Sequence, residues 1–199
     1  IPPQEYWQRL REIADKYDVL LIADEVITGF GRLGEYFGPM NWGVQPDITT
    51  VAKALTSGYA PLGAAIATKK VADAFTGGPE ETFTHLITFG GHPSACAAAL
   101  ANLEIFEKED LVGNSKKMGD YLFEKLLELK KYDIVGDVRG GLGLLAAVEF
   151  VADKKEKVAF PASAKLAQKL PKFLFDRNIV TFRAGDIISI CPPLSITKN

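Results

Sequence analysis

The chain has 199 residues and a formal net charge of −2 at pH 7, with 47% hydrophobic and 24% charged residues. This composition is typical of a globular protein with a substantial core and gives no reason to expect nucleic acid or a membrane as partner, since no apolar run approaches the roughly 20 residues of a membrane helix. Two cysteines, Cys96 and Cys191, provide no disulfide framework or metal cluster and fit a reducing compartment such as the cytoplasm.

Up to about residue 108 the pattern alternates between helices and short strands. Tyr6, Leu10 and Ile13 recur at helical spacing. The unbroken apolar run Val19–Ala23 predicts a strand buried on both faces, as in parallel sheets covered by helices. The expected elements are a helix at about 4–17, strands at 19–24, 47–52 and 63–68, a short helix at 71–75 and a helix at 94–108.

The composition changes near residues 107–110, where we expect a domain boundary. The expected later elements are a long amphipathic helix at 111–131, a strand at 142–151, a charged turn at 153–157, a helix at 162–177 and a strand at 178–183. The chain therefore predicts an α/β part of the βαβ type, residues 1–107, followed by a smaller α+β part, residues 108–199.

Two carboxylates, Asp24 and Glu25, follow the first strand. In open α/β sheets, ligands bind outside the carboxyl ends of the strands, so one of the two acids is expected to point into a site. The alternative is that both acids solvate a loop. The glycines that follow match the dinucleotide pattern G-x-G-x-x-G at Gly29, Gly31 and Gly34. Because no helix is expected to open there and two acids would repel a pyrophosphate, a nicotinamide-type nucleotide site is disfavoured.

Lys53 ends the second strand, between two alanines. A lysine packed against apolar groups favours its neutral amine, which can attack a carbonyl carbon. The alternative is a lysine that extends from the strand end to solvent.

The loop Thr88–Pro93 leads into a helix N-terminus, where backbone N–H groups and a threonine hydroxyl could bind a phosphate. It could equally be an ordinary helix entry with His92 as a polar cap, and His85 with His92 does not give metal-binding spacing. Arg183, at the end of a predicted strand, could bind a carboxylate through its two-pronged guanidinium, although a surface salt bridge is the default for a single arginine.

Several of these pieces together resemble one family. The order and spacing are similar to those of class III pyridoxal-phosphate aminotransferases, which include omega-amino-acid and amine–pyruvate transaminases. The motifs that carry the resemblance are Asp24–Arg32, Pro46–Ile48, Ala52–Leu55, Gly58, Pro61–Ala64 and Thr88–Pro93. The resemblance implies part of the aspartate-aminotransferase-like large domain with a mostly parallel sheet, at residues 1–107, and a small C-terminal domain at 108–199.

The resemblance also implies roles for individual residues. Lys53 would form the Schiff base with pyridoxal 5′-phosphate, Asp24 would pair with the pyridine nitrogen, and Val26 would pack on one face of the ring. Thr88 would bind the cofactor phosphate of the neighbouring subunit, so the active site would need a homodimer or a higher homo-oligomer. Arg183 falls where many members bind the substrate carboxylate.

The expected activity is transfer of an amino group from an amine or omega-amino acid to pyruvate or a similar 2-oxo acid. An aminomutase or decarboxylase on the same cofactor remains open, because it shares the same carbanion chemistry. A non-catalytic fragment is also open: the chain starts at Ile1-Pro2-Pro3 without a methionine. It resembles roughly the C-terminal half of such enzymes, and it lacks the Gly-Ser turn and stacking aromatic of their earlier half.

Overall fold

The computed structural model describes residues 2–198, except for the side chains of Ala167 and of residues 182–184. The chain forms two compact units, Pro2–Val112 and a second unit that begins at Gly113. The boundary between a large and a small domain near residue 108 stays a prediction, because a division by contacts within this chain does not test the domains of a whole enzyme.

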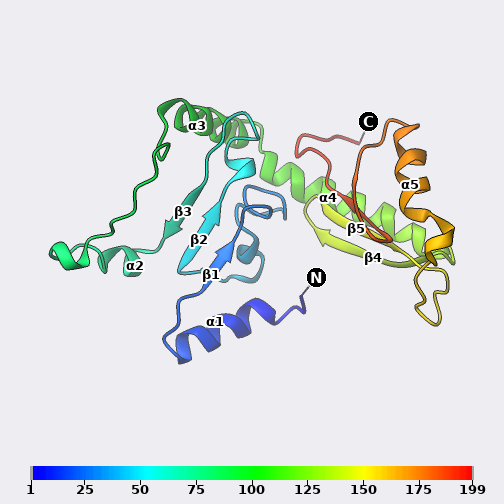
Figure 1. Cartoon of the computed structure of the whole chain (residues 1–199), viewed down its shortest axis with the longest axis horizontal. Coiled ribbons are helices and arrows are strands. Elements are labelled where there is room, and N and C mark those ends of the chain that lie inside the picture. The colour runs from blue at the N-terminus through cyan, green and yellow to red at the C-terminus, as the bar shows by residue number, and fades with distance from the viewer. Residues whose placement is uncertain (1, 199) are drawn as a thin grey trace. The chain divides into compact units, whose positions relative to one another are not determined.

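The first unit contains the alternating helices and strands that the sequence predicts (Figure 1). Its helices and strands are α1 (Tyr6–Lys16), β1 (Ile22–Asp24), β2 (Ile48–Val51), β3 (Ala64–Ala67), α2 (Lys69–Asp73) and α3 (Pro93–Lys108). Short 3₁₀ helices lie between them at Gly38–Trp42, Lys53–Leu55 and Pro79–Glu81.

The three strands of this unit form one sheet in the order β1-β2-β3. β1 and β2 are parallel, with Ile22 opposite Ile48 and Asp24 opposite Thr50. β3 is antiparallel to β2, with Ala67 opposite Ile48. An antiparallel edge strand is common on an otherwise parallel sheet, and here it brings the chain back along β2 from the loop that follows Lys53.

The prediction that the first strand is buried on both faces is wrong for the described part of the chain. Ala23 is 1% exposed, whereas Ile22 is 58% exposed and Val19 and Leu20 are also exposed. β1 is an edge strand of a three-stranded sheet, and the described residues cover only one of its faces. The apolar run predicted the strand correctly but did not reveal how much of this chain would cover it.

The start of the sheet is tied to α1 by Asp47. Asp47 Oδ2 accepts hydrogen bonds from the Leu21 backbone N–H and from Arg11 Nη1, each at 2.8 Å. The backbone N–H of Leu21 and, next, the Arg11 guanidinium hold the pKa of the Asp47 carboxyl below its usual value. Arg11 also contacts Asp15 on its own helix, at 2.7 Å. This network aligns the beginnings of β1 and β2, and therefore the ends from which the candidate residues project.

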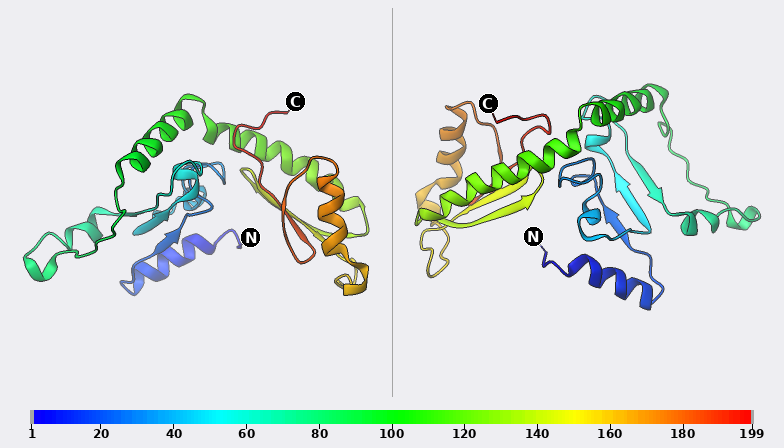
Figure 2. Two further views of the ribbon diagram at one scale, coloured as in Figure 1. Left: turned by 45° about the horizontal axis from the view of Figure 1, so that its top comes forward. Right: turned by 180° about the vertical axis from the view of Figure 1, so that it is seen from behind.

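The second unit packs a helix against an antiparallel sheet (Figure 2). Its elements are α4 (Leu111–Leu127), β4 (Val135–Leu142), β5 (Leu145–Phe150), α5 (Leu166–Phe175), β6 (Phe182–Ala184) and β7 (Ile187–Ile190), with 3₁₀ helices at Glu128–Lys131 and Ala162–Ala164. The sheet order is β4-β5-β7-β6. Val135, Val138 and Val148 form its core, against which Phe123 and Leu126 of α4 pack.

Two strands of this unit were not predicted, and a third was placed too early. No strand was expected over β4; in the structure its Gly140 lies so close to the Phe123 ring that an added Cβ would approach it to 2.9 Å. β7 was also missed. The strand expected at 178–183 is confined to β6, because Asn178 is left-handed (φ 60°) and the Ile179 N–H bonds back to Leu174 O, which closes α5 instead.

Candidate active site

Asp24 and Lys53 follow the same ends of two adjacent parallel strands, β1 and β2. Asp24 is the last residue of β1 and lies opposite Thr50, and the Glu25 N–H donates to Thr50 O at 2.9 Å. Lys53 follows three residues after Thr50. Neighbouring strands are about 4.8 Å apart, so a carboxylate and an amine follow adjacent strands at the same end of the sheet. Ligands bind at this end in α/β folds.

The two acids at the end of β1, Asp24 and Glu25, have different environments. Glu25 is 3% exposed, and its Oε2 accepts a hydrogen bond from the Gly38 N–H at 2.7 Å. Asp24 is exposed, and its Oδ1 accepts the Val26 N–H at 3.0 Å. That turn holds the Asp24 carboxylate in place and leaves its Oδ2 without a hydrogen bond from the described residues. Glu25 is therefore committed to the backbone, and Asp24 is the acid available to a ligand.

Lys53 begins a 3₁₀ helix with an unusual backbone. Its φ is 38°, and the preceding Ala52 has φ −160° and ψ −144°. The sequence left two environments open for Lys53, and in the described part of the chain its side chain is exposed. No hydrogen bond or ion pair with another described residue involves its amine. Lys53 therefore presents a free amine at the end of the sheet that also carries Asp24.

The residues after Asp24 form turns rather than a helix. Val26 is half-buried beside Asp24. Gly31 and Gly34 have φ values of 87° and 78°, which a residue with a side chain rarely adopts. The chain from Val26 to Leu33 makes no helix, so the expectation that no helix opens at these glycines is confirmed.

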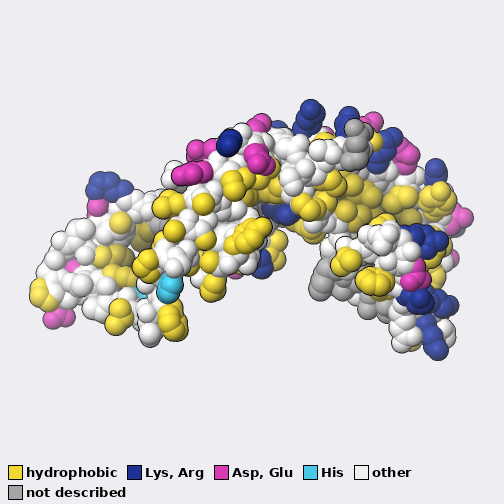
Figure 3. Space-filling view, turned by 90° about the horizontal axis from the view of Figure 1, so that it is seen from above, with side chains coloured by type: hydrophobic (Ala, Val, Ile, Leu, Met, Phe, Trp, Pro, Cys, Tyr) yellow, Lys and Arg dark blue, Asp and Glu magenta, His cyan; other side chains and the backbone are white. Residues whose placement is uncertain are grey.

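Thr88 lies in a segment that is exposed throughout, from Ala72 to Ser94. This segment connects α2 with α3, and Figure 3 shows hydrophobic side chains beside its histidines on the surface. Phe83 contacts Phe75 and His85 through ring contacts at 5.3 and 5.8 Å. Thr88 is exposed, with no hydrogen bond to the described residues. No hydrogen bond among the described residues connects Thr88 with Asp24 or Lys53.

The remaining candidates are His92, a metal site and Arg183. His92 occupies the N-cap position of α3 without a side-chain capping bond, so the expectation of a histidine cap is wrong. Among residues 2–198, no group of three or more His, Cys, Asp or Glu side chains could hold a metal ion. Arg183 belongs to β6, but its side chain lies outside the described residues.

One residue near the site was not predicted at all. Asn102 of α3 donates from Nδ2 to the carbonyl oxygens of Ala54 and Leu55, directly after Lys53. The available signal was a lone amide in a helix that is otherwise rich in alanine and leucine.

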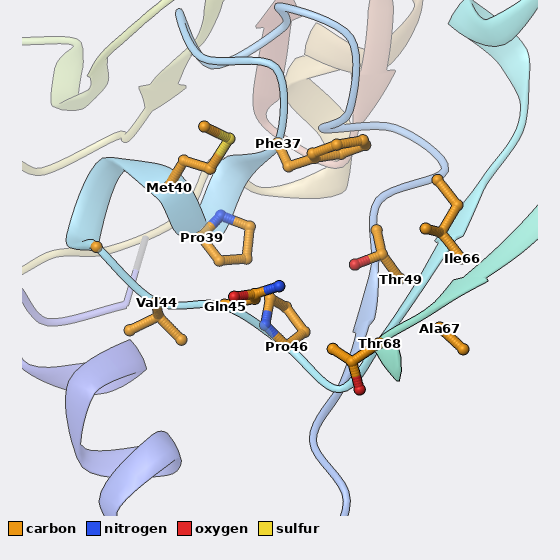
Figure 4. Close-up of a pocket in the computed structure, with 11 residues that line it drawn as sticks. Phe37, Pro39, Met40, Val44, Gln45, Pro46, Thr49, Ile66, Ala67 and Thr68 are labelled. Carbon is orange, nitrogen blue, oxygen red and sulfur yellow. The ribbon is translucent and has the colours of Figure 1, made fainter. Parts of the chain in front are cut away.

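A cavity of about 450 Å³ lies elsewhere in the first unit. Figure 4 shows Phe37 and Pro39 on one side of it and Thr49 and Ile66, from β2 and β3, on the other. None of the candidate site residues lines this cavity.

No helix among the described residues is both long and apolar enough to cross a membrane.

The sequence profile described as Aminotransferase class-III matches residues 1–199, the whole chain. The chain belongs to the class III aminotransferase family. This class III aminotransferase chain is 44% identical over 207 residues to the taurine–pyruvate aminotransferase of Bilophila wadsworthia, covering all of this chain and 45% of that protein.

Solved structures agree with this assignment. An (S)-enantioselective omega-transaminase from Thermomicrobium roseum superposes with a TM-score of 0.94 at 44% identity, over 100% of this chain and 44% of that one. An amine transaminase from an uncultivated Pseudomonas species, in a PLP-bound form, gives a TM-score of 0.92 at 43% identity, over 100% and 45% of the two chains. The class III chain therefore has the fold of the PLP-dependent transaminases and spans less than half the length of these relatives.

Proposed function

We propose that this chain carries the lysine and the ring-binding carboxylate of a pyridoxal-phosphate-dependent transaminase. The proposed reaction moves an amino group from an amine or omega-amino acid to pyruvate or a similar 2-oxo acid. The observation that carries the proposal is the register of β1 and β2, which places Asp24 and Lys53 at the ends of adjacent parallel strands. Membership of the class III family and a taurine–pyruvate relative support the reaction type.

The described residues fit this cofactor. Asp24 offers a carboxylate oxygen to a protonated pyridine nitrogen, and Val26 beside it offers an aliphatic surface for a ring. Lys53 offers an unengaged amine for covalent attachment. Glu25 does not compete with Asp24 for the ring nitrogen, because its carboxyl group is buried and accepts the Gly38 N–H. A nearby carboxylate favours the protonated form of the ring nitrogen.

When bound, pyridoxal phosphate supplies an electron sink for the charge left on a substrate carbon that loses a proton. The Asp24 carboxylate would keep the ring nitrogen protonated and orient the ring. The Lys53 amine, once released from covalent attachment, would act as a general base and remove the proton from the substrate carbon. It would then act as a general acid and return the proton at C4′ of the cofactor. Val26 would hold the ring without a polar atom that competes for its charge.

The proposal extends to two residues outside β1, β2 and the turn after Lys53. Thr88 would bind the cofactor phosphate of a neighbouring subunit in a homodimer or higher homo-oligomer, which accords with its position in an exposed segment with apolar side chains such as Leu86 and Phe89. Arg183 would bind the substrate carboxylate.

The free thiols of Cys96 and Cys191 fit a cytoplasmic location.

The test uses protein produced from the complete gene, mixed with pyridoxal phosphate. We expect a visible absorption band and, after borohydride reduction and proteolysis, the cofactor mass on the peptide that contains Lys53. Lys53→Ala removes both signals, whereas Lys69→Ala, an exposed lysine of the same unit, retains both. A colourless wild-type protein contradicts the proposal and favours a non-catalytic chain.

The reaction type requires a separate assay on the holoenzyme. We expect an amine and pyruvate to yield a carbonyl product and alanine in equal amounts. Release of carbon dioxide, or an isomerised amino acid with no alanine, would instead identify a decarboxylase or an aminomutase.

A further inference from the structure

The backbone from Lys53 to Gly58 is held in a conformation that its sequence does not favour. Lys53 and Ser57 have positive φ values, 38° and 49°, and Gly58 has 81°. A non-glycine residue with positive φ is uncommon, and two within five residues persist only when the surroundings enforce them. Contacts with other parts of the protein must therefore stabilise this backbone conformation.

Asn102 supplies these contacts from α3. Its Nδ2 donates to Ala54 O at 2.8 Å and to Leu55 O at 3.1 Å, and its Oδ1 accepts the Ser57 hydroxyl at 2.7 Å. The two carbonyls belong to the 3₁₀ helix that begins at Lys53, where carbonyls at the end of a short helix need partners from elsewhere. One amide thus uses both of its N–H groups and its oxygen on the five residues that follow the lysine.

Asn102 can hold the turn in place because α3 is itself anchored. Phe106, one helical turn after Asn102, is buried and packs edge-on against Phe30 with ring centroids 6.4 Å apart. Ala95 and Ala99 are also buried. Phe30 lies in the turns that follow Asp24, so α3 connects the segment after Asp24 with the segment after Lys53.

We propose that Asn102 is a positioning residue, which fixes the Lys53 backbone so that the amine of Lys53 meets the cofactor and the substrate carbon at a productive position. This inference rests on the proposed function. It adds to that function a residue that touches neither cofactor nor substrate. A displacement of about 1 Å at a reacting group can lower a rate about 10²-fold, so the effect of Asn102 should appear in kcat rather than in cofactor occupancy.

The test compares Asn102→Ala and Asn102→Asp with Asn114→Ala in the holoenzyme from the complete gene. Asn114 is a matched control, since its Nδ2 also donates to two carbonyls, Leu194 O at 2.5 Å and Ile196 O at 3.0 Å, in the second unit. For each variant we measure the melting temperature, the absorption band of the lysine-bound cofactor across pH, kcat and KM.

We expect both alanine variants to lose similar thermal stability and to keep the absorption band. Asn102→Ala should lower kcat about 10²-fold and shift the pH midpoint of the band, while Asn114→Ala leaves both within twofold or unchanged. Asn102→Asp should recover relative to Asn102→Ala as the pH falls, because a neutral carboxyl can donate one hydrogen bond to a carbonyl and a carboxylate cannot. If Asn102→Ala does not fold, this pH dependence of Asn102→Asp against wild type carries the test.

Two results would overturn the inference. A wild-type protein with the band, together with an Asn102→Ala variant whose kcat and pH midpoint are unchanged or no more altered than those of Asn114→Ala, reduces Asn102 to a stabilising contact and leaves the proposed function intact. A wild-type protein without the band rejects the proposed function and the positioning role with it.

Discussion

Adjacent carboxylates at the end of β1 should have opposite consequences when each is removed. Glu25 is buried and bonded to a backbone N–H, whereas Asp24 is exposed and holds only the Val26 N–H through one oxygen. Glu25→Ala should therefore destabilise the protein, and Asp24→Asn should reduce activity with little effect on stability. The two substitutions are matched controls for each other because they lie one residue apart.

The magnitudes follow from the contacts. The 2.7 Å bond from the Gly38 N–H to the Glu25 carboxylate is charge-assisted, and removing it should cost about 1.5–3 kcal/mol because Gly38 is buried as well. Glu25→Gln keeps an acceptor oxygen and should cost about 1 kcal/mol. Asp24→Asn should change stability by less than about 0.5 kcal/mol, while the loss of a charge aimed at the reacting cofactor should lower kcat about 10²–10³-fold.

Thermal unfolding of the apo-proteins and amine–pyruvate turnover of the holoenzymes provide the two measurements. The outcome that refutes this reasoning is a stable, inactive Glu25→Gln variant beside an Asp24→Asn variant with normal turnover. It would mean that the buried acid serves the cofactor and that the exposed one only solvates the turn.

Two further predictions concern the scaffold. The backbone N–H of Leu21 and then the Arg11 guanidinium lower the pKa of Asp47 in the folded protein. Asp47→Asn should therefore lower the free energy of unfolding by about 1–2 kcal/mol at neutral pH. This difference from wild type should shrink below pH 3.8 as Asp47 is protonated in wild type, and unfolding by denaturant at several pH values measures it. Gly119→Ala should lose about 3 kcal/mol or more in the same assay, because its Cβ would lie 2.1 Å from the Gly143 carbonyl oxygen.

A matched control substitution exists for Asp47→Asn and for Gly119→Ala. Asp73→Asn removes an exposed carboxylate paired only with Lys69 and should change stability by less than about 0.5 kcal/mol at every pH. Gly78→Ala adds a methyl group where no atom lies within 4 Å and should be tolerated. A Gly119→Ala variant as stable as Gly78→Ala would contradict the close approach of α4 to the β4–β5 turn.

Local patterns were sufficient for most helices and for the first three strands. Apolar spacing placed α1 and α4, and a proline followed by small residues placed α3. An apolar run placed β1, a β-rich run placed β2, and a run of small residues placed β3. The order and spacing of motifs around Asp24, Lys53 and Thr88 identified the family, which the match over residues 1–199 confirms. These features depend on residues close together in the chain, so they can be predicted from the amino-acid sequence alone.

The sequence failed where the environment of a residue depends on distant parts of the chain. No strand was expected over β4, where Gly140 and Gly141 lie against the Phe123 ring of α4, a partner distant in sequence. The exposure of Ile22 and of Lys53 depends on which elements cover the sheet, and an apolar run cannot specify how many of them this chain supplies.

The family, most of the helices and a strand-ending acid and lysine could be read from the amino-acid sequence. The folded chain was needed to show that Glu25 is buried while Asp24 is exposed, and that Asn102 of α3 binds the turn after Lys53. These features depend on hydrogen bonds to Gly38 and to Ala54 that join residues 13 and 48 positions apart. Such bonds follow from how the folded chain packs and have no signature in local periodicity.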